Sequence, residues 1–219
     1  MNFTRTLLAA ALLSTTVLAQ ANITHASFVD VAGSISFDGW NELNRNRVGG
    51  ALTEADLVAG TGSNVVGSGD AVLTRVTGDH YPAGSGLYGG ASTFTFTDST
   101  LAPSADALVF QGIINNFSGV DFALTLSFNG GSQALAASTI SSVLTGGVAD
   151  QYTYTWDLSG LAQPVGDYTL TFGIGFSQML AFQVDQVAAV PEPSTYALLA
   201  GGLGVVGFVA RRRSGVAAR

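Results

Sequence analysis

Four stretches of the chain alternate, residue by residue, between apolar or aromatic side chains and small polar ones: residues 93–97, 122–128, 152–156 and 168–172. Successive side chains of a β-strand point to opposite faces of the sheet, so this pattern indicates strands with one buried and one exposed face. In the third stretch Tyr152, Tyr154 and Trp156 share one face. We expect that face to lie in the core.

Five more stretches favour strands, namely residues 28–37, 70–77, 107–114, 135–142 and 180–187. The dipeptide Asn129-Gly130 between two of the nine is a tight-turn signal. Strands at near-regular spacing with almost no helical periodicity predict an all-β fold. We expect a single antiparallel β-sandwich, jelly-roll-like, over residues 22–189.

One short helix interrupts this pattern. Thr53 and Asp56 have the spacing of a capping box, and Gly60 is a stop signal. Residues 49–69 and 78–90 are otherwise glycine-rich and are predicted to be long loops. Loops on a rigid sandwich are the usual place for a binding site.

Charge and cysteine content exclude some classes of protein. Residues 22–190 contain three arginines, no lysine and fourteen acidic residues, a formal charge of about −11. A basic surface for nucleic acid is therefore absent. The chain has no cysteine, so an exported fold must be stabilised by its core and not by disulfides. A surface rich in glycine and hydroxyl residues suits an extracellular matrix protein.

The first 21 residues have the parts of a secretory signal peptide. Arg5 precedes an apolar run over residues 7–13, and Ala19-Gln20-Ala21 is a small-x-small cleavage site. The alternative is a permanent N-terminal anchor, but the apolar run is short for a span. We therefore expect export and a mature chain that starts at Asn22.

The last thirty residues have three parts in order. Val190-Pro191-Glu192-Pro193 comes first, residues 196–210 are uncharged, and Arg211-Arg212-Arg213 follows. Fifteen helical residues cover roughly 22 Å of a hydrocarbon layer about 30 Å thick, and arginines can reach the interface from the helix end. A short transmembrane helix is favoured over a buried core helix. The arginines place the tail on the cytoplasmic side and the sandwich across the membrane.

This three-part tail, residues 190–219, resembles the PEP-CTERM sorting signal of Gram-negative bacteria. The resemblance implies recognition by an exosortase, a membrane-embedded cysteine transpeptidase found with exopolysaccharide systems. It also implies removal of the tail and transfer of the protein to the cell surface or the extracellular matrix. It covers about thirty of the 219 residues and implies nothing about the sandwich.

Motifs for catalysis are missing from the sequence. There is no G-x-S-x-G, no H-E-x-x-H and no cysteine nucleophile. Of the two histidines, His25 is near the expected mature N-terminus, and His80 follows Asp79 in a predicted loop. A solvated His80 is favoured over a general base. We predict that the protein is not an enzyme and needs no cofactor for catalysis.

One resemblance concerns a metal. Residues 182–187 resemble the final strand of carbohydrate-binding jelly rolls, although Gln186 departs from the usual pattern. The resemblance implies a structural calcium held by Asp185 and an acid from the first strand, here Asp30. The alternative is that both are ordinary solvated carboxylates.

Aromatic residues in predicted loops give the remaining site candidates. Trp40, Tyr81 and Tyr88 could stack on sugar faces, although packing within the protein is favoured for them. The leading prediction is a non-enzymatic surface or matrix protein with a structural or adhesive role in exopolysaccharide or biofilm. The alternative is a carbohydrate-binding module or, with less support, a polysaccharide-active enzyme on the same sandwich.

Overall fold

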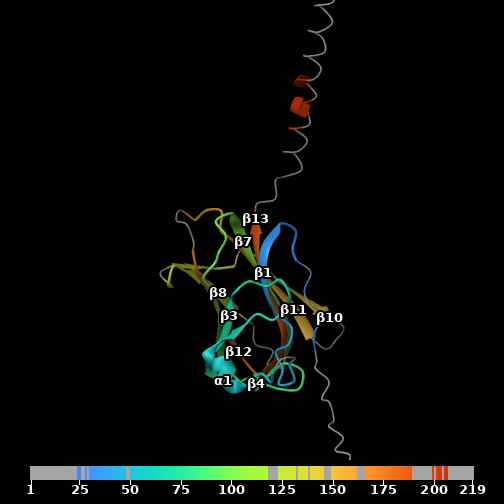
Figure 1. Ribbon diagram of the computed structural model, residues 1–219, viewed down its shortest axis with the longest axis vertical. Helices are drawn as coiled ribbons and strands as arrows, with labels where there is room; N and C mark the ends of the chain where they lie inside the picture. The colour runs from blue at the N-terminus through green and yellow to red at the C-terminus, as the bar shows by residue number, and fades with distance from the viewer. Residues whose placement is uncertain are drawn as a thin grey trace, which may run out of the picture.

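The computed structural model describes residues 24–25, 28, 30–47, 50–117, 123–131, 133–137, 139–145, 149–161 and 166–188, and in the tail residues 199, 201–203 and 205–206 (Figure 1). The predicted signal peptide lies outside the described residues. So do the sorting residues 190–193 and 211–213. In the part of the tail that is described, as in the rest of the described chain, no helix is long and apolar enough to span a membrane.

Over residues 24–188 the described part of the protein consists of two antiparallel sheets and one short helix, and the described tail residues 199, 201–203 and 205–206 are also helical (Figure 1). Sheet A has seven strands in the order β10-β11-β7-β13-β5-β4, with β1 also paired to β13; sheet B has six in the order β2-β3-β6-β12-β8-β9. The elements are β1 (Ser34–Trp40), α1 (Glu54–Ala59), β2 (Thr61–Gly62), β3 (Val72–Gly78), β4 (Tyr81–Pro82), β5 (Leu87–Gly89), β6 (Ser92–Asp98), β7 (Ala105–Asn116), β8 (Ala123–Phe128), β9 (Gln133–Leu135), β10 (Thr139–Thr145), β11 (Ala149–Asp157), β12 (Tyr168–Ile174) and β13 (Ser177–Ala188).

A single apolar core joins the two sheets. Phe96 of sheet B lies 5.3 Å, centroid to centroid, from both Phe172 of the same sheet and Phe182 of sheet A. Tyr154 and Trp156 are buried and stacked, and Tyr152 packs beside them, as the alternation predicts. The prediction of one antiparallel β-sandwich is therefore confirmed at the level of two sheets packed face to face.

Most predicted strands are present, but residues 135–142 do not form one strand. Leu135 ends β9 in sheet B, and Thr139 begins β10 in sheet A. The chain changes sheets here without a glycine or proline to mark the break. The turn predicted at Asn129-Gly130 is confirmed, because β8 pairs with β9 and both residues have positive φ angles of 51° and 67°.

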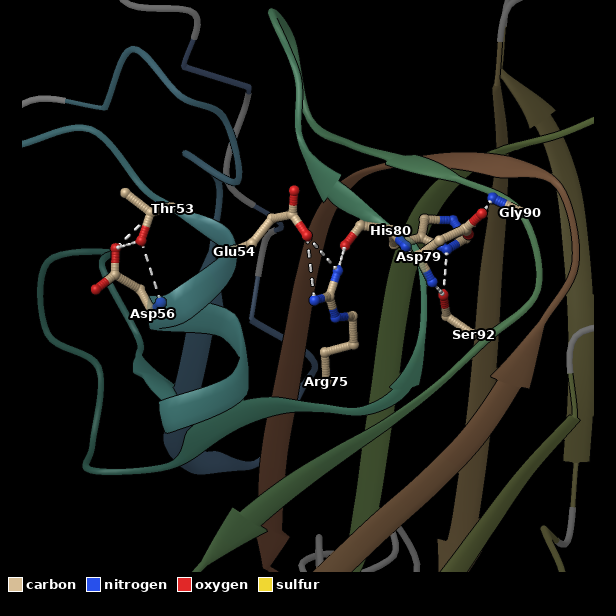
Figure 2. A network of polar contacts seen from close by, with 8 residues as sticks. All are labelled: Thr53, Glu54, Asp56, Arg75, Asp79, His80, Gly90 and Ser92. Carbon is tan, nitrogen blue, oxygen red and sulfur yellow. Dashed lines mark hydrogen bonds and ion pairs between the residues drawn. The ribbon is translucent and has the colours of Figure 1, made fainter.

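The predicted helix is confirmed as α1, with the expected capping box. Thr53 Oγ1 accepts a hydrogen bond from Asp56 N at 3.2 Å, and Asp56 Oδ2 accepts one from Thr53 N at 2.8 Å (Figure 2). Leu57 is the residue of α1 that enters the core. Gly60 ends the helix with a φ of 100°, a conformation that favours glycine.

The predicted loop over residues 78–90 is wrong in part, because it contains β4 and β5. These strands have two and three residues, too few for periodicity to reveal them. β5 pairs with β13 and β4 pairs with β5, so this segment extends sheet A. The predicted loop over residues 49–69 contains, besides the helix α1 that was predicted within it, the two-residue strand β2, which was not predicted.

Candidate functional site

A row of side chains crosses the outer face of sheet A where β13 begins. Tyr88 is opposite Tyr81 on one side and Gln178 on the other, and Gln178 is opposite Asn115. Directly opposed residues of antiparallel strands point to the same face, whereas their neighbours point to the other. The adjacent residues Leu87 and Met179 are fully buried in the core. The row therefore faces outward.

Two further aromatic residues complete a cluster with this row. Phe117 follows β7 and Phe176 precedes β13, and the amide of Phe117 donates to the carbonyl of Phe176 at 3.0 Å. Ring centroids are 6.1 Å apart for Tyr81 and Tyr88, 5.3 Å for Tyr88 and Phe176, and 5.2 Å for Phe117 and Phe176. We call Tyr81, Tyr88, Phe117 and Phe176 the aromatic cluster.

The aromatic cluster is accessible. Tyr81 is 41% exposed, Phe117 54% and Phe176 44%, with Tyr88 half-buried between them. Among the described residues these three are the only aromatic side chains in the exposed class. Exposed rings are thus concentrated in one place and are not scattered over the surface.

Amide and hydroxyl groups lie beside the aromatic cluster. Asn115 Nδ2 donates to Gln178 Oε1 at 3.1 Å, and Gln178 Nε2 donates to Ser85 Oγ at 2.7 Å. The carbonyl of Ser85 is in turn 2.6 Å from His25 Nε2. These bonds fix the orientation of the Asn115 and Gln178 side-chain amides. A surface glutamine without such bonds would have no fixed orientation.

Trp40 does not belong to this surface, and its predicted loop position is wrong. It is the last residue of β1 and is 1% exposed. Its indole stacks at a tilt on Phe96, 4.9 Å between centroids, and Nε1 donates to the carbonyl of Thr61 at 3.3 Å. Buried in this way, Trp40 cannot contact a glycan.

Asp30 and Asp185 are brought together by one amide. Gln183 Nε2 donates to Asp30 Oδ1 at 3.0 Å and to Asp185 Oδ2 at 3.1 Å, and Ser34 Oγ donates to Asp185 Oδ1 at 2.8 Å. Asp185 is fully buried. Burial raises its pKa, the bonds from Ser34 and Gln183 lower it, and the nearby Asp30 raises it again.

This geometry bears on the calcium hypothesis without testing it. Asp185 is buried, so the alternative that both aspartates are ordinary solvated carboxylates does not hold for Asp185. Hard oxygen ligands of the kind that calcium prefers are present in both side chains. However, no group of three or more histidine, cysteine or acidic side chains in the described residues is arranged to hold a metal ion. A calcium here would draw its remaining ligands from amides, hydroxyls or water.

Asp30 and Gln183 also line a cavity of about 490 Å³. Its walls combine the rings of Phe28 and Phe37 with the amides of Asn41 and Asn64 and the carboxylate of Glu42. The cavity is a second place where a small polar ligand would fit, and it lies over β1 rather than at the aromatic cluster.

His80 is buried, so the prediction of a solvated loop histidine is wrong. Its Nδ1 is 2.8 Å from Ser92 Oγ of β6, and its Nε2 is 2.9 Å from Ser177 Oγ of β13, so the ring joins the two sheets. The amides of Asp79 and His80 both donate to Ser92 Oγ, at 3.0 and 3.1 Å (Figure 2). The Ser92 hydroxyl proton then points to Nδ1, and Nε2 carries the ring proton and donates to Ser177.

Burial lowers the pKa of His80 to about 4, against a smaller opposing effect of the Asp79 carboxylate. A serine–histidine contact is the geometry of an activated nucleophile. Here His80 and Ser177 are both fully buried, so no substrate reaches them. Outside this contact, Arg75 of β3 donates to the carbonyl of His80 and pairs with Glu54 of α1 at 3.3 Å (Figure 2). The histidine is part of the packing, and α1 is tied to it.

Comparison with solved structures finds two carbohydrate-binding modules. One, specific for non-crystalline cellulose, is 15% identical, covers 74% of this chain and 94% of its own, and has a TM-score of 0.31. The other, studied for specific mannan recognition, is 13% identical, covers 56% of this chain and 74% of its own, and has a TM-score of 0.25. Scores this low leave the ligand of this chain to be argued from its own residues.

A search of the curated proteins finds no match. A family model described as the PEP-CTERM protein-sorting motif matches residues 189–213. The match includes Val190, Pro191, Glu192 and Pro193 as well as the three arginines that end at Arg213, which confirms the resemblance inferred from the sequence. Directly after β13, the chain carries a PEP-CTERM protein-sorting motif.

Proposed function

We propose that the protein is exported, recognised through its PEP-CTERM motif by an exosortase, and delivered to the cell surface or the extracellular matrix. The observation that carries this proposal is the motif match at residues 189–213. Its position supports the proposal, because β13 ends at Ala188. Processing within or after the motif would leave both sheets complete. Before processing, the apolar tail would hold the protein in the membrane.

In that location the sandwich would have a structural or adhesive role in exopolysaccharide or biofilm. Its composition supports a passive role, since only 11% of the chain is charged and threonines alternate with the buried residues of β6 and β12. The histidine that could serve catalysis is buried, which favours a protein that is not an enzyme. The net negative charge of the sandwich supports a function without nucleic acid as a partner.

A second candidate function, carbohydrate binding, is favoured by the aromatic cluster and the amides beside it. The two functions are compatible, because a matrix protein must be retained by something in the matrix. The cluster is the described surface best suited to that task.

Sorting is tested with a tagged full-length chain in a host that encodes an exosortase. We expect the parent to be shortened at its C-terminus and to leave the membrane fraction. A variant with Pro191→Ala and Pro193→Ala should remain unprocessed in the membrane, and so should the parent in a host whose exosortase gene is deleted. Pro103→Ala, which changes an exposed proline outside the motif, is the matched control. Normal processing of the double variant would refute the proposed role of the motif.

A further inference from the structure

We propose that the aromatic cluster is a binding site for a neutral polysaccharide, and that it retains the exported protein in its matrix. The inference rests on the proposed surface location for its biological meaning. Its chemical basis is independent of sorting. The cluster consists of Tyr81, Tyr88, Phe117 and Phe176, with Gln178, Asn115 and Ser85 along one side.

The chemistry of the cluster matches that of a sugar ring. A pyranose has faces made largely of C–H groups and a rim of hydroxyls. Exposed aromatic rings bind the C–H faces, and amides already oriented by hydrogen bonds bind the hydroxyls. Gln178 is held between Asn115 and Ser85, at 3.1 and 2.7 Å, and is only half-buried. Its amide is thus positioned in advance for a hydroxyl.

The rings do not form one flat surface. Tyr88 is nearly perpendicular to both Tyr81 and Phe176, with interplanar angles of 78° in each case. A flat crystalline surface could not contact all of these rings at once. A single, twisting chain with successive sugars in different orientations could. We therefore infer a soluble or amorphous polysaccharide chain as the ligand.

Charge restricts the ligand further. Residues 22–190 have fourteen acidic residues against three arginines, and no residue of the cluster or its amide row is charged. Arg75, one of the three, is already paired with Glu54. A polyanionic polysaccharide would be repelled by the net negative charge of the sandwich. A neutral polysaccharide is not repelled.

The cluster is too small for a stable dimer. Three rings with exposures of 41 to 54% present about 300 Å² of aromatic surface, taking about 200 Å² per ring. A stable protein interface buries about 800 Å² on each partner. The spacing between ring centroids, 5.2 to 6.4 Å, is comparable with the size of one sugar unit, so the cluster would contact a few consecutive sugars.

The test uses the full-length chain purified in detergent and native electrophoresis through gels containing hydroxyethylcellulose, galactomannan, dextran or the polyanion alginate. We expect at least one neutral polysaccharide to retard the protein and alginate not to. Tyr81→Ala combined with Phe176→Ala should weaken the apparent affinity about tenfold or more, and Tyr81→Ala alone by less. Val76→Ala, an exposed apolar residue of β3 in sheet B, is the matched control.

Three results would overturn the proposal. They are no retardation by any neutral polysaccharide, retardation that the double variant retains, and a dimer in sedimentation velocity that the double variant dissociates. Retardation that the double variant retains would mean that the polysaccharide binds elsewhere, for example in the cavity beside Asp30. A dimer that the double variant dissociates would mean that the cluster binds a second copy of the chain. Failure here is distinguishable from failure of sorting. In cells the double variant should still be processed at its tail but be released from the matrix, whereas a sorting failure leaves all variants in the membrane.

Discussion

The buried His80 should make the stability of the sandwich depend on pH. Its pKa is about 4 in the folded protein, against an ordinary value of 6.5, because burial disfavours the charged ring. The hydrogen-bond partners of His80 are a second reason for its low pKa. Both lone pairs of Ser92 Oγ are used by the amides of Asp79 and His80, so a protonated Nδ1 would have no acceptor there.

The sign and size of the effect follow from the two pKa values. Because the folded pKa is the lower one, the neutral ring contributes its full stability above pH 6.5, and this contribution is lost as the pH falls toward 4. Between pH 7 and pH 4.5 the free energy of unfolding should fall by about 2.4 kcal/mol from this group alone. Asp38 and Asp185 act in the opposite direction. Burial raises the pKa of both carboxyls above 3.8, so they favour the folded state as the pH falls.

The contribution of His80 is therefore measured as a difference between variants. Urea unfolding of a fragment of residues 22–189, which contains both sheets, is followed at pH 7 and at pH 4.5 for the parent and for His80→Gln. The two aspartates titrate in both proteins and cancel. We expect the parent to lose about 2.4 kcal/mol more than the variant between the two pH values. His25→Gln, which removes the other histidine from a partly exposed position, is the control. Equal losses in the parent and in His80→Gln would refute the reasoning.

Two further predictions concern Trp40 and the pair of aspartates. Trp40→Ala should destabilise the fragment by about 3–5 kcal/mol in urea unfolding, because it empties a fully buried site against Phe96; a loss below about 1 kcal/mol would place the indole outside the core. If Asp30 and Asp185 hold calcium, the melting temperature of the fragment should rise more in calcium than in magnesium at equal ionic strength, and Asp185→Asn should abolish the difference. Equal responses to the two ions would mean that the two carboxylates keep their hydrogen bonds to Gln183 and Ser34 and hold no calcium.

The alternating pattern predicted the sandwich because burial of one strand face is a local property of the sequence. Where packing overrides a local signal, the prediction failed. The first predicted strand ends at residue 37, yet β1 continues through Asp38 and Gly39 to Trp40. Asp38 faces inward and accepts hydrogen bonds from Ala71 N and Ser63 Oγ, each at 3.1 Å. Gly39 leaves room for Val65, which a Cβ would meet at 2.8 Å. These contacts carry the strand on to Trp40 and bury the indole.

The candidate site was predicted only in part for a similar reason. Tyr81 and Tyr88 are close in sequence and belong to one glycine-rich segment, so they could be identified together. Phe117 and Phe176 are distant from them and from each other. Only the pairing of β7 with β13, which sets Asn116 opposite Ser177, brings their rings into contact. The one available signal was that each phenylalanine lies in a short segment between two predicted strands.

The last strand runs from the aromatic cluster to the sorting motif. β13 begins at Ser177, next to Phe176 of the aromatic cluster, and ends at Ala188, next to the sorting motif. Twelve strand residues span about 40 Å. In Figure 1 the label of β13 and that of β4 lie at opposite ends of the sandwich. If the tail holds the protein in the membrane before processing, as proposed, this geometry would direct the aromatic cluster away from the lipid surface and toward the proposed polysaccharide ligand. Binding could then begin before the tail is removed, and processing would release a protein that its matrix already holds.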